Sequence, residues 1–243
     1  MKIQKSSDTK TKYVKMLVYG AAGIGKTVFA ATAPNPLILD VEGGLMSIAD
    51  KDIDYIPIKV WNDIQEAFME IVSGKIPNET IVIDSLTECS KKSMDALLGA
   101  VISGQTTAQA EKVIPNQHDW LMNIEEVRRL TRAFRDLPKH IIMTCLQRDE
   151  KNELSGGITR KPAVSAKSLA DDIVGYFDIV GYMEADKEGN RFILTQPYKT
   201  QQGYSCYAKD RSGKLETFEE PDFSKIVKKI CEAPKKNGAR RNK

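Results

Sequence analysis

The sequence predicts an α/β fold, in which helices cover a mainly parallel sheet that ends in an antiparallel edge. Two observations favour this class. Short apolar runs alternate with amphipathic segments up to residue 146, and two later runs, 178–183 and 191–195, flank a turn at Asp186–Gly189. Strands separated by helices form parallel sheets, whereas a short turn joins antiparallel neighbours.

The individual elements follow from residue type and spacing. Runs of apolar, often β-branched residues predict strands at 13–19, 37–39, 80–83 and 141–146, and the less regular stretch 54–58, interrupted by Pro57, is a further strand candidate. Apolar residues at helical spacing predict helices at 26–31, 62–73, 87–102, 119–136 and 223–230. Asn62, with Gln65, is expected to cap the second helix, and Gly74 to follow its end. Residues 147–165 are expected to form a polar loop.

The net charge of +3 hides an uneven distribution. Residues 1–15 carry +4 and residues 234–243 carry +5, which leaves −6 for residues 16–233. We therefore expect flexible basic ends at 1–12 and 233–243 around one domain at 13–232. Flexible Lys/Arg segments bind polyanions, although many such ends only aid solubility.

Other counts exclude several classes of protein. The apolar run 16–25 is too short to cross a bilayer, and the polar N-terminus shows no secretory signal, so no membrane association is expected. The four cysteines lie far apart and only two histidines are present, which argues against a zinc site or a disulfide framework. A reduced cytoplasm fits these counts.

A phosphate-binding motif carries the strongest functional signal. Residues 20–27, GAAGIGKT, match GxxxxGK[ST] between a predicted strand and a predicted helix. The backbone N–H groups of such a loop cradle phosphates, the Lys26 ammonium neutralises them, and the Thr27 hydroxyl binds Mg²⁺. The predicted nucleotide-binding residues are Gly20, Ala21, Ala22, Gly23, Ile24, Gly25, Lys26, Thr27 and Val28.

Two carboxylates are candidates to complete the site. Asp84 ends the apolar run 80–83, where it would hold Mg²⁺ together with Thr27, or else cap the next helix. Glu42 follows the strand 37–39 and precedes two glycines. If that strand lies beside the P-loop strand, Glu42 sits near the γ-phosphate and activates water. The alternative is an ordinary exposed loop acid.

Together these segments resemble the RecA-like P-loop ATPases, and more closely a phage-encoded group of them that includes single-strand annealing proteins. PLILDVEGG at 36–44, GYFDIVGYM at 175–183 and YAKDRSG at 207–213 are similar to that group. The resemblance covers about residues 13–232. It implies a RecA-like core, ATP and Mg²⁺ as cofactors, and the cytoplasm as location, that of the host if the protein is phage-encoded.

The resemblance also implies residue roles. Glu42, in Asp40-Val41-Glu42, looks like the catalytic glutamate, and Gln147 or Leu146 like the sensor. Lys209 and Arg211 look like cations that are inserted into a neighbour's nucleotide site, although a surface turn explains the same residues. The stretches 104–118 and 147–167 stand where the family has its two DNA loops.

These features lead to one main interpretation and two alternatives. The main one is an ATPase that assembles as a ring or filament on single-stranded DNA, promotes annealing or strand pairing, and works with a single-strand-binding protein. Arg128, Arg132 and Arg135 share a helix face, but nearby acids favour a salt-bridged surface there. The alternatives are a small-molecule kinase and an ATP-gated assembly module or switch with little turnover.

Overall fold

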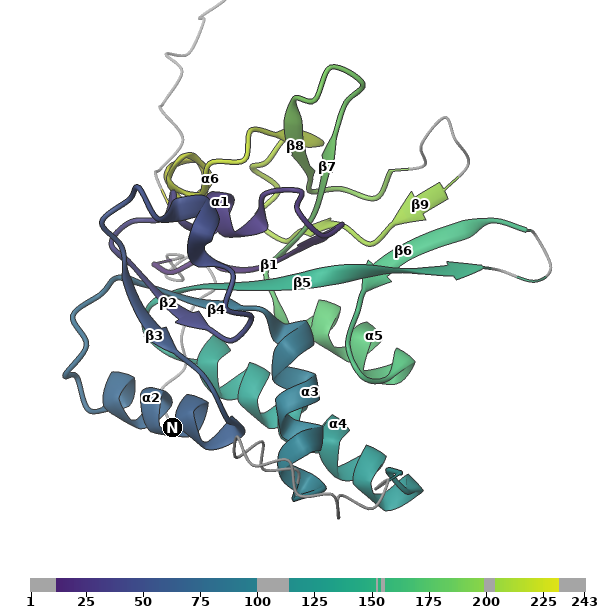
Figure 1. The fold of residues 1–243 in the computed structure, drawn as a ribbon. Coiled ribbons are helices and arrows are strands. Elements are labelled where there is room, and N and C mark those ends of the chain that lie inside the picture. Colours follow the sequence, from purple (N-terminus) through teal and green to yellow (C-terminus); the bar gives the residue numbers. More distant parts are fainter. Residues whose placement is uncertain (1–11, 100–113, 152, 154–155, 199–203, 232–243) are drawn as a thin grey trace, which may run out of the picture.

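A single sheet forms the centre of the molecule, with helices on both faces (Figure 1). The computed structural model describes residues 12–99, 114–151, 153, 156–198 and 204–231. Within these ranges the main strand order is β11-β8-β7-β1-β5-β4-β2-β3. The strands are β1 (Lys15–Gly20), β2 (Pro36–Asp40), β3 (Asp54–Pro57), β4 (Thr80–Asp84), β5 (His140–Lys151), β6 (Ile158–Pro162), β7 (Ile179–Ala185), β8 (Arg191–Leu194), β9 (Tyr204–Cys206), β10 (Lys209–Asp210) and β11 (Phe218–Glu219).

The predicted mainly parallel sheet is confirmed. β1 pairs in parallel with β5 and β7, and β4 with β5 and β2, while β8, β10 and β11 add the antiparallel edge. β1 and β4 are buried along almost their whole lengths, as expected for parallel strands covered on both faces.

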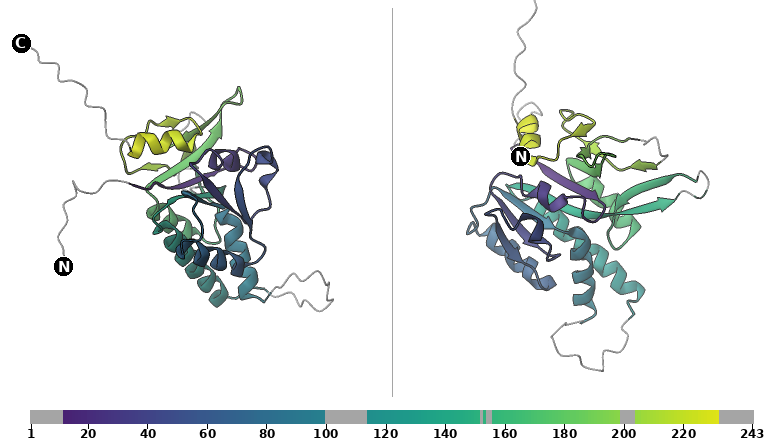
Figure 2. Two further views of the ribbon diagram at one scale, coloured as in Figure 1. Left: turned by 90° about the vertical axis from the view of Figure 1, so that its left-hand side faces the viewer. Right: turned by 45° about the horizontal axis from the view of Figure 1, so that its top comes forward.

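Helices divide between the two faces of the sheet (Figure 2). The helices are α1 (Lys26–Ala30), α2 (Trp61–Val72), α3 (Leu86–Leu97), α4 (Gln117–Arg135), α5 (Lys167–Tyr176) and α6 (Phe223–Cys231), and a short 3₁₀ helix spans Leu45–Ile48. Apolar residues of α2–α5 pack on one face with Leu17 and Tyr19 of β1. Those of α1 and α6 pack on the other with Met16 and Val18. Strand alternation therefore assigns each β1 side chain to one of two cores.

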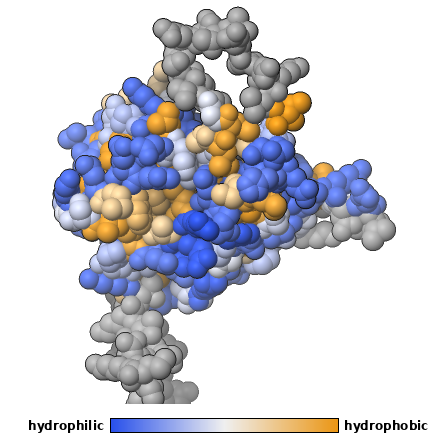
Figure 3. All heavy atoms as spheres, turned by 90° about the horizontal axis from the view of Figure 1, so that it is seen from below, coloured by the Kyte–Doolittle hydropathy of each residue, from blue (hydrophilic) through white to orange (hydrophobic). Residues whose placement is uncertain are grey.

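The outer surface of the α2–α5 layer is mostly hydrophilic, with hydrophobic residues between the polar ones, as Figure 3 shows from below. Exposed apolar side chains on these helices include Met69 of α2 and Leu121 of α4. Single exposed apolar residues are ordinary on a protein surface, so they mark no site by themselves.

Gly20 joins β1 to the loop that follows, at a point where β7 approaches closely. A Cβ atom on Gly20 would lie 2.5 Å from the Met183 carbonyl oxygen of β7. Gly20 and Met183 are paired across these two parallel strands. The start of the phosphate motif is therefore fixed against β7 by backbone packing.

The start of α2 differs from the prediction. Asn62 lies inside the helix, and its amide donates to Glu66 at 2.6 Å. Asp63 caps the helix instead, because its Oδ2 accepts from the backbone N–H groups of Lys59 at 2.7 Å and Val60 at 3.0 Å. Gly74 follows the helix with a φ of 78°, the left-handed conformation expected there.

The predicted polar loop at 147–165 is wrong in most of its length. β5 continues to Lys151 and pairs with the antiparallel β6, which also pairs with β9. The two strands project beyond the sheet as a ribbon (Figure 2). α5 follows at Lys167–Tyr176, a helix that the sequence pattern does not predict. Residues 152, 154 and 155 lie outside the described residues.

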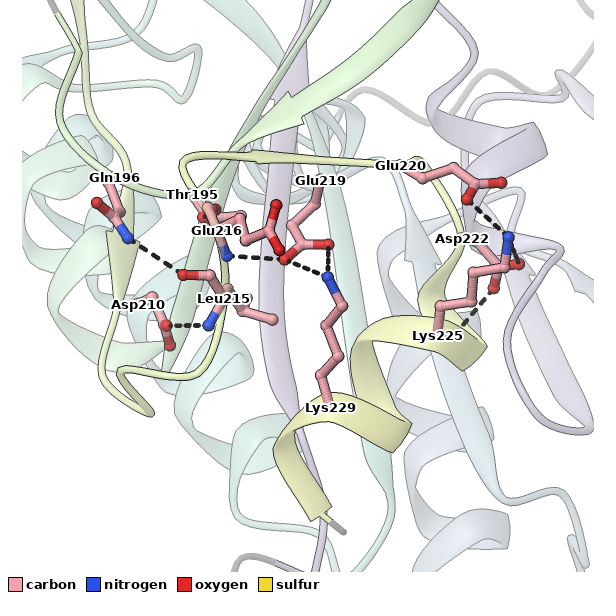
Figure 4. A network of polar contacts seen from close by, with 10 residues as sticks. All are labelled: Thr195, Gln196, Asp210, Leu215, Glu216, Glu219, Glu220, Asp222, Lys225 and Lys229. Atoms are coloured by element: carbon pink, nitrogen blue, oxygen red, sulfur yellow. Dashed lines mark hydrogen bonds and ion pairs between the residues drawn. The ribbon is translucent and has the colours of Figure 1, made fainter. Parts of the chain in front are cut away.

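A network of polar contacts fixes the C-terminal edge and α6 to the sheet (Figure 4). The buried Glu219 carboxylate of β11 accepts from Lys229 of α6 at 2.8 and 2.9 Å, and from the Glu216 N–H at 2.9 Å. Asp210 of β10 accepts from the Leu215 N–H at 2.9 Å. These contacts satisfy the buried carboxylate of Glu219 and join three late segments of the chain.

Candidate active site

Residues 20–27 span the last residue of β1, the loop that follows it and the first two residues of α1, at the carboxyl end of the parallel strands. Gly23 and Gly25 have φ values of 73° and 106°, a conformation that side chains with a Cβ rarely adopt. No side chain caps the N-terminus of α1, and its first turn contains no acid. The first N–H groups of a helix have no partner within the helix, so here they remain available to an anion.

Lys26 is the first residue of α1, and its side chain folds back onto the start of the loop. Its Nζ donates to the carbonyl oxygens of Ala21 at 2.8 Å and Gly20 at 3.2 Å, and the residue is 7% exposed. Burial lowers the pKa of Lys26, while the nearby carboxylates of Asp84 and Glu42 act in the opposite direction. The ammonium group is therefore held where a phosphate would neutralise it.

Asp84 ends β4 next to Thr27. The Thr27 hydroxyl donates to Asp84 Oδ2 at 2.6 Å, and the Thr144 hydroxyl of β5 donates to Asp84 Oδ1. Asp84 is 3% exposed, and the peptide bond that follows it is cis. Ser85 caps α3, because its hydroxyl oxygen accepts from the Glu88 N–H, so Asp84 is not the cap of this helix.

The oxygen atoms of Thr27 and Asp84 fit Mg²⁺. This ion is typically held by one or two carboxylates together with substrate phosphates, and it prefers hard oxygen ligands. Among the described residues no group of three or more His, Cys, Asp or Glu side chains is placed to hold a metal ion. A site completed by phosphate oxygens agrees with both observations.

Glu42 lies near Asp84, but the neighbouring strands that position it differ from those expected. β2 does not lie beside β1, because β5 and β4 stand between them. The chain after β2 instead folds over the end of β4, where the N–H groups of Val41 and Glu42 donate to the Asp84 carbonyl oxygen at 2.8 and 3.1 Å. Asp40 stabilises the turn by accepting from the N–H groups of Gly43 and Gly44 at 2.8 and 3.3 Å.

The protonation of Glu42 reflects this crowding. Partial burial of the carboxyl raises its pKa, and repulsion from Asp84 adds to the rise, while Lys26 opposes it. A carboxylate with a raised pKa is a stronger base than an ordinary surface glutamate. The backbone contacts and the charge interactions place Glu42 in one cluster with Lys26, Thr27 and Asp84.

A cavity of about 930 Å³ lies next to Glu42, which is one of its lining residues. Ile58, which follows β3, and Trp61 of α2 form part of its apolar wall, and Lys59, Lys92 and Asp95 supply charged groups. The cavity is large enough for a small molecule next to the candidate base.

Lys209 and Arg211 lie at the opposite end of the sheet. β10 pairs with Ile179 and Val180 at the start of β7, whereas Gly20 pairs with Met183 four residues further on, about 13 Å away at the usual strand rise. Lys209 donates to the Val174 carbonyl, and Arg211 donates to the Gly175 carbonyl at 2.8 Å. Both cations thus cap the C-terminal end of α5, and neither reaches the P-loop of its own chain.

Gln147 lies four residues beyond Met143, the β5 residue that pairs with Ile83 of β4, and it contacts Tyr182 of β7. Its Oε1 accepts from the Tyr182 hydroxyl at 3.1 Å. Strand alternation places Leu146 on the Thr144 side of the sheet and Gln147 on the Cys145 side. The sensor role of either residue stays a prediction.

Two residues at the site were not found from the sequence. Thr144 lies in the middle of an apolar strand, and only its contact with Asp84 reveals it. Arg191 begins β8 and lies against Gly25 of the P-loop, far away in the sequence. A polar residue within the buried run 141–146 was the one available signal for Thr144, and no motif marks Arg191.

The comparison with known families agrees with this geometry. A family model described as an AAA domain matches residues 12–212. The chain belongs to this family. An AAA domain is a P-loop ATPase domain, so the chain is a nucleotide-binding protein of the ATP-hydrolase type. The matched range of the AAA domain contains every site residue discussed above.

Two further findings complete the comparison. No curated protein matches the sequence at a significant level. Among the described residues of the AAA domain and of α6, no helix combines the length and the apolar character that a membrane span requires.

Proposed function

We propose that the protein is an ATP-binding, Mg²⁺-dependent RecA-like ATPase that acts on single-stranded DNA, in phage-type recombination or single-strand annealing. The observation that carries the ATPase part is the cluster at the carboxyl end of the sheet. There the Thr27 hydroxyl donates a hydrogen bond to Asp84 Oδ2 at 2.6 Å, and the Glu42 N–H donates one to the Asp84 carbonyl oxygen.

Each residue of this cluster has a task in the proposal. The P-loop N–H groups and Lys26 bind the phosphates of ATP, and Thr27 and Asp84 hold Mg²⁺. When bound, the ion stabilises charge on the phosphate oxygens. Glu42 orients the attacking water and accepts its proton, which its raised pKa favours.

The DNA part of the proposal is supported by charge and by the resemblance described above. The two chain ends carry +4 and +5, whereas the middle of the chain carries −6. Segments rich in Lys and Arg attract the phosphate backbone with an affinity that falls as salt rises. Most of both ends lies outside the described residues.

Two internal segments that could bind DNA, 147–167 and α4, carry cations that already form ion pairs within the chain. In the 147–167 segment, Arg160 pairs with Glu184 and Lys161 pairs with Glu150 and Asp171. On α4, Arg128 pairs with Glu125 and Asp172. Cations that are already paired attract DNA phosphate less, so the basic ends are the favoured contacts. Residues 104–113 of the other candidate lie outside the described residues.

Hydrolysis of ATP with and without single-stranded DNA, at several salt concentrations, tests the proposal. We expect DNA to stimulate phosphate release at low salt and the stimulation to fall as salt rises. Removing residues 234–243 deletes a charge of +5 and should flatten this salt dependence. A hydrolysis rate that ignores DNA, together with no DNA binding at low salt, would exclude the DNA role.

Self-association is a further part of the proposal. Lys209 and Arg211 lie far from the P-loop of the chain that contains them. In a ring or filament they would instead contact the nucleotide bound to the neighbouring copy. Arg211→Ala should then lower turnover at protein concentrations that allow assembly, while nucleotide binding is retained. If turnover persists at every concentration, Arg211 serves only as a cap of α5.

The cavity beside Glu42 favours a second candidate, a small-molecule kinase. In that case Glu42 would accept the proton of an acceptor hydroxyl bound among Ile58, Lys59 and Trp61. A kinase forms ADP without an equal amount of free phosphate when its acceptor is present. Equal release of ADP and phosphate, with or without candidate acceptors, decides for the ATPase.

A further inference from the structure

A cation from the β7–β8 hairpin lies against the P-loop. The guanidinium group of Arg191 is so close to Gly25 that a Cβ on this glycine would lie 2.9 Å from Nη1 and 3.2 Å from Cζ. Gly25 directly precedes Lys26 and is the N-cap residue of α1. The contact therefore brings a second positive charge to the loop that contains Lys26.

The sheet topology explains this placement. β7 runs parallel to β1 and is in register with it from Met16 to Gly20, and then continues two residues beyond Met183 to Ala185. Ala185 pairs with Arg191 of β8. Arg191 consequently stands past the end of β1, beside the P-loop and away from the sheet core.

Arg191 has no competing role within the described residues. Its side chain makes no ion pair or hydrogen bond there, and the residue is exposed. By contrast, Arg160 and Arg128 each pair with at least one carboxylate. An exposed arginine held against a phosphate-binding loop is free to accept a phosphate as its partner.

The order of the strands indicates which part of a nucleotide Arg191 meets. Asp84 and Glu42, the groups for Mg²⁺ and the γ-phosphate, stand on the β5–β4 side of the P-loop. β7 and β8 stand on the other side. A triphosphate whose γ end lies at Asp84 must therefore extend its α end toward β8.

We infer that Arg191 binds the diphosphate portion of the nucleotide, on the side opposite Asp84, within the same chain; this role rests on the proposed nucleotide site. It differs from that of Arg211, which would act on a neighbour's nucleotide. Because the diphosphate is common to ATP and ADP, Arg191 contributes to the affinity for both. Its contribution to the chemical step is small, since the interaction is the same before and during the transfer of the γ-phosphate.

The test compares Arg191→Ala with the parent in direct titrations with ADP and ATP, in the presence of Mg²⁺, and in hydrolysis at saturating ATP. We expect Kd to rise about tenfold for both nucleotides, as for the loss of one charge-assisted contact at an exposed site. The turnover number at saturation should stay within twofold of the parent. Arg191→Lys should recover part of the affinity, since it keeps the charge but not the planar fork.

Lys187→Ala is the matched control. Lys187 is an exposed cation at the tip of the same hairpin, so its removal changes the net charge equally without touching Gly25. Its Kd values should match those of the parent. The ligand-free melting temperatures of both variants should also match the parent, which separates lost binding from lost folding.

Three results would overturn the inference. Unchanged Kd values in Arg191→Ala would show that Arg191 does not contact the diphosphate. An equal rise in Kd in Lys187→Ala would show that the effect comes from net charge and not from this contact. A turnover number that falls while both Kd values stay constant would place Arg191 at the γ-phosphate instead. Lys26→Ala tests the assumed nucleotide site separately. If nucleotide binding survives this change, the P-loop is not the nucleotide site, whatever the result for Arg191.

Discussion

The two ends of the central sheet use similar side chains for different purposes. At the amino end, Lys15 donates to the carbonyls of Leu137 and Lys139, and Lys209 and Arg211 donate to those of α5. Lys209 and Arg211 close the C-terminal end of α5, as the helix dipole favours, and Lys15 holds the segment that follows α4. At the carboxyl end, the N-terminus of α1 has no side-chain cap, and Asp84 and Glu42 repel each other.

The polar groups at the amino end are hydrogen-bonded and stabilise the fold, whereas the uncapped N–H groups of α1 at the carboxyl end lack partners that a ligand could supply. Mutual repulsion and uncapped N–H groups cost stability, and sites of this type are commonly functional. Substitutions at the carboxyl end should therefore change turnover with little loss of stability. Substitutions of Lys15 and in the C-terminal network should do the reverse, whereas Arg211 keeps the separate role proposed above in the site of a neighbouring copy.

The largest expected effect is that of Glu42→Gln. Loss of the carboxylate base should lower the rate of ATP hydrolysis by about 10³-fold, within the range for general base catalysis. Binding of ATP should persist, and the melting temperature should not fall, because repulsion from Asp84 is relieved. Phosphate release, nucleotide titration and thermal melting check the three statements. Hydrolysis that is unaffected would leave Glu42 an ordinary loop acid.

Asp84→Ala should lower hydrolysis by about 10²-fold, a loss of roughly 2.7 kcal/mol in transition-state stabilisation. The concentration of Mg²⁺ needed for half-maximal turnover should rise as well, since one of the two proposed protein ligands is gone. Glu188→Ala removes an exposed acid from the tip of the β7–β8 hairpin and serves as the control. An unchanged Mg²⁺ requirement in Asp84→Ala would remove Asp84 from the metal site.

In the C-terminal network, Glu219→Ala should reduce the free energy of unfolding by about 2 kcal/mol, because it leaves Lys229 and the Glu216 N–H without their partner. Turnover per folded molecule should not change. Glu220→Ala, which removes an exposed partner of Lys225, should cost less than about 1 kcal/mol. Urea titration of both variants measures the difference, and equal losses would contradict the role given to burial.

The smallest effect concerns Lys15. Burial lowers its pKa to about 8, while Asp178 and Asp136 oppose the shift. The unfolded chain keeps this proton up to about pH 10.4, so between about pH 8 and 10 the unfolded state binds more protons and stability rises with pH. The free energy of unfolding of the parent should thus rise relative to that of Lys15→Met from pH 7 to pH 10 in chemical denaturation. A difference that is constant with pH would contradict the lowered pKa.

Much of the fold could be predicted because its signals are local. The strands of the parallel core are continuous apolar runs, and GAAGIGKT specifies a conformation together with a chemistry. The ribbon of β5 and β6 escaped prediction because residues 147–151 are polar and partly exposed, so that no apolar run marks them. α5 escaped because only Leu169, Ala170 and Ile173 of its ten residues are buried.

The site was predicted less completely, since its assembly depends on tertiary contacts. The sequence indicated Thr27 and Asp84, but the position of Glu42 depends on how the chain crosses the end of β4. The sequence predicts Asn62 as the cap because Asn is common at that position, yet the Asp63 carboxylate accepts from both free N–H groups. Arg191 comes from a hairpin about 165 residues beyond the P-loop, a distance that no local pattern spans.

The close approach of Gly20 to β7 limits how the phosphate motif can be studied. A side chain at this position would collide with the Met183 carbonyl before any nucleotide is present. An inactive Gly20 variant would consequently report a displaced strand, and with it a displaced Arg191 hairpin, rather than a lost phosphate contact. A substitution at Gly23 meets no such collision, because nothing lies within 4 Å of a Cβ placed there, but its φ of 73° strains any residue with a Cβ, so its effect reports the loop conformation as well as the phosphate contact.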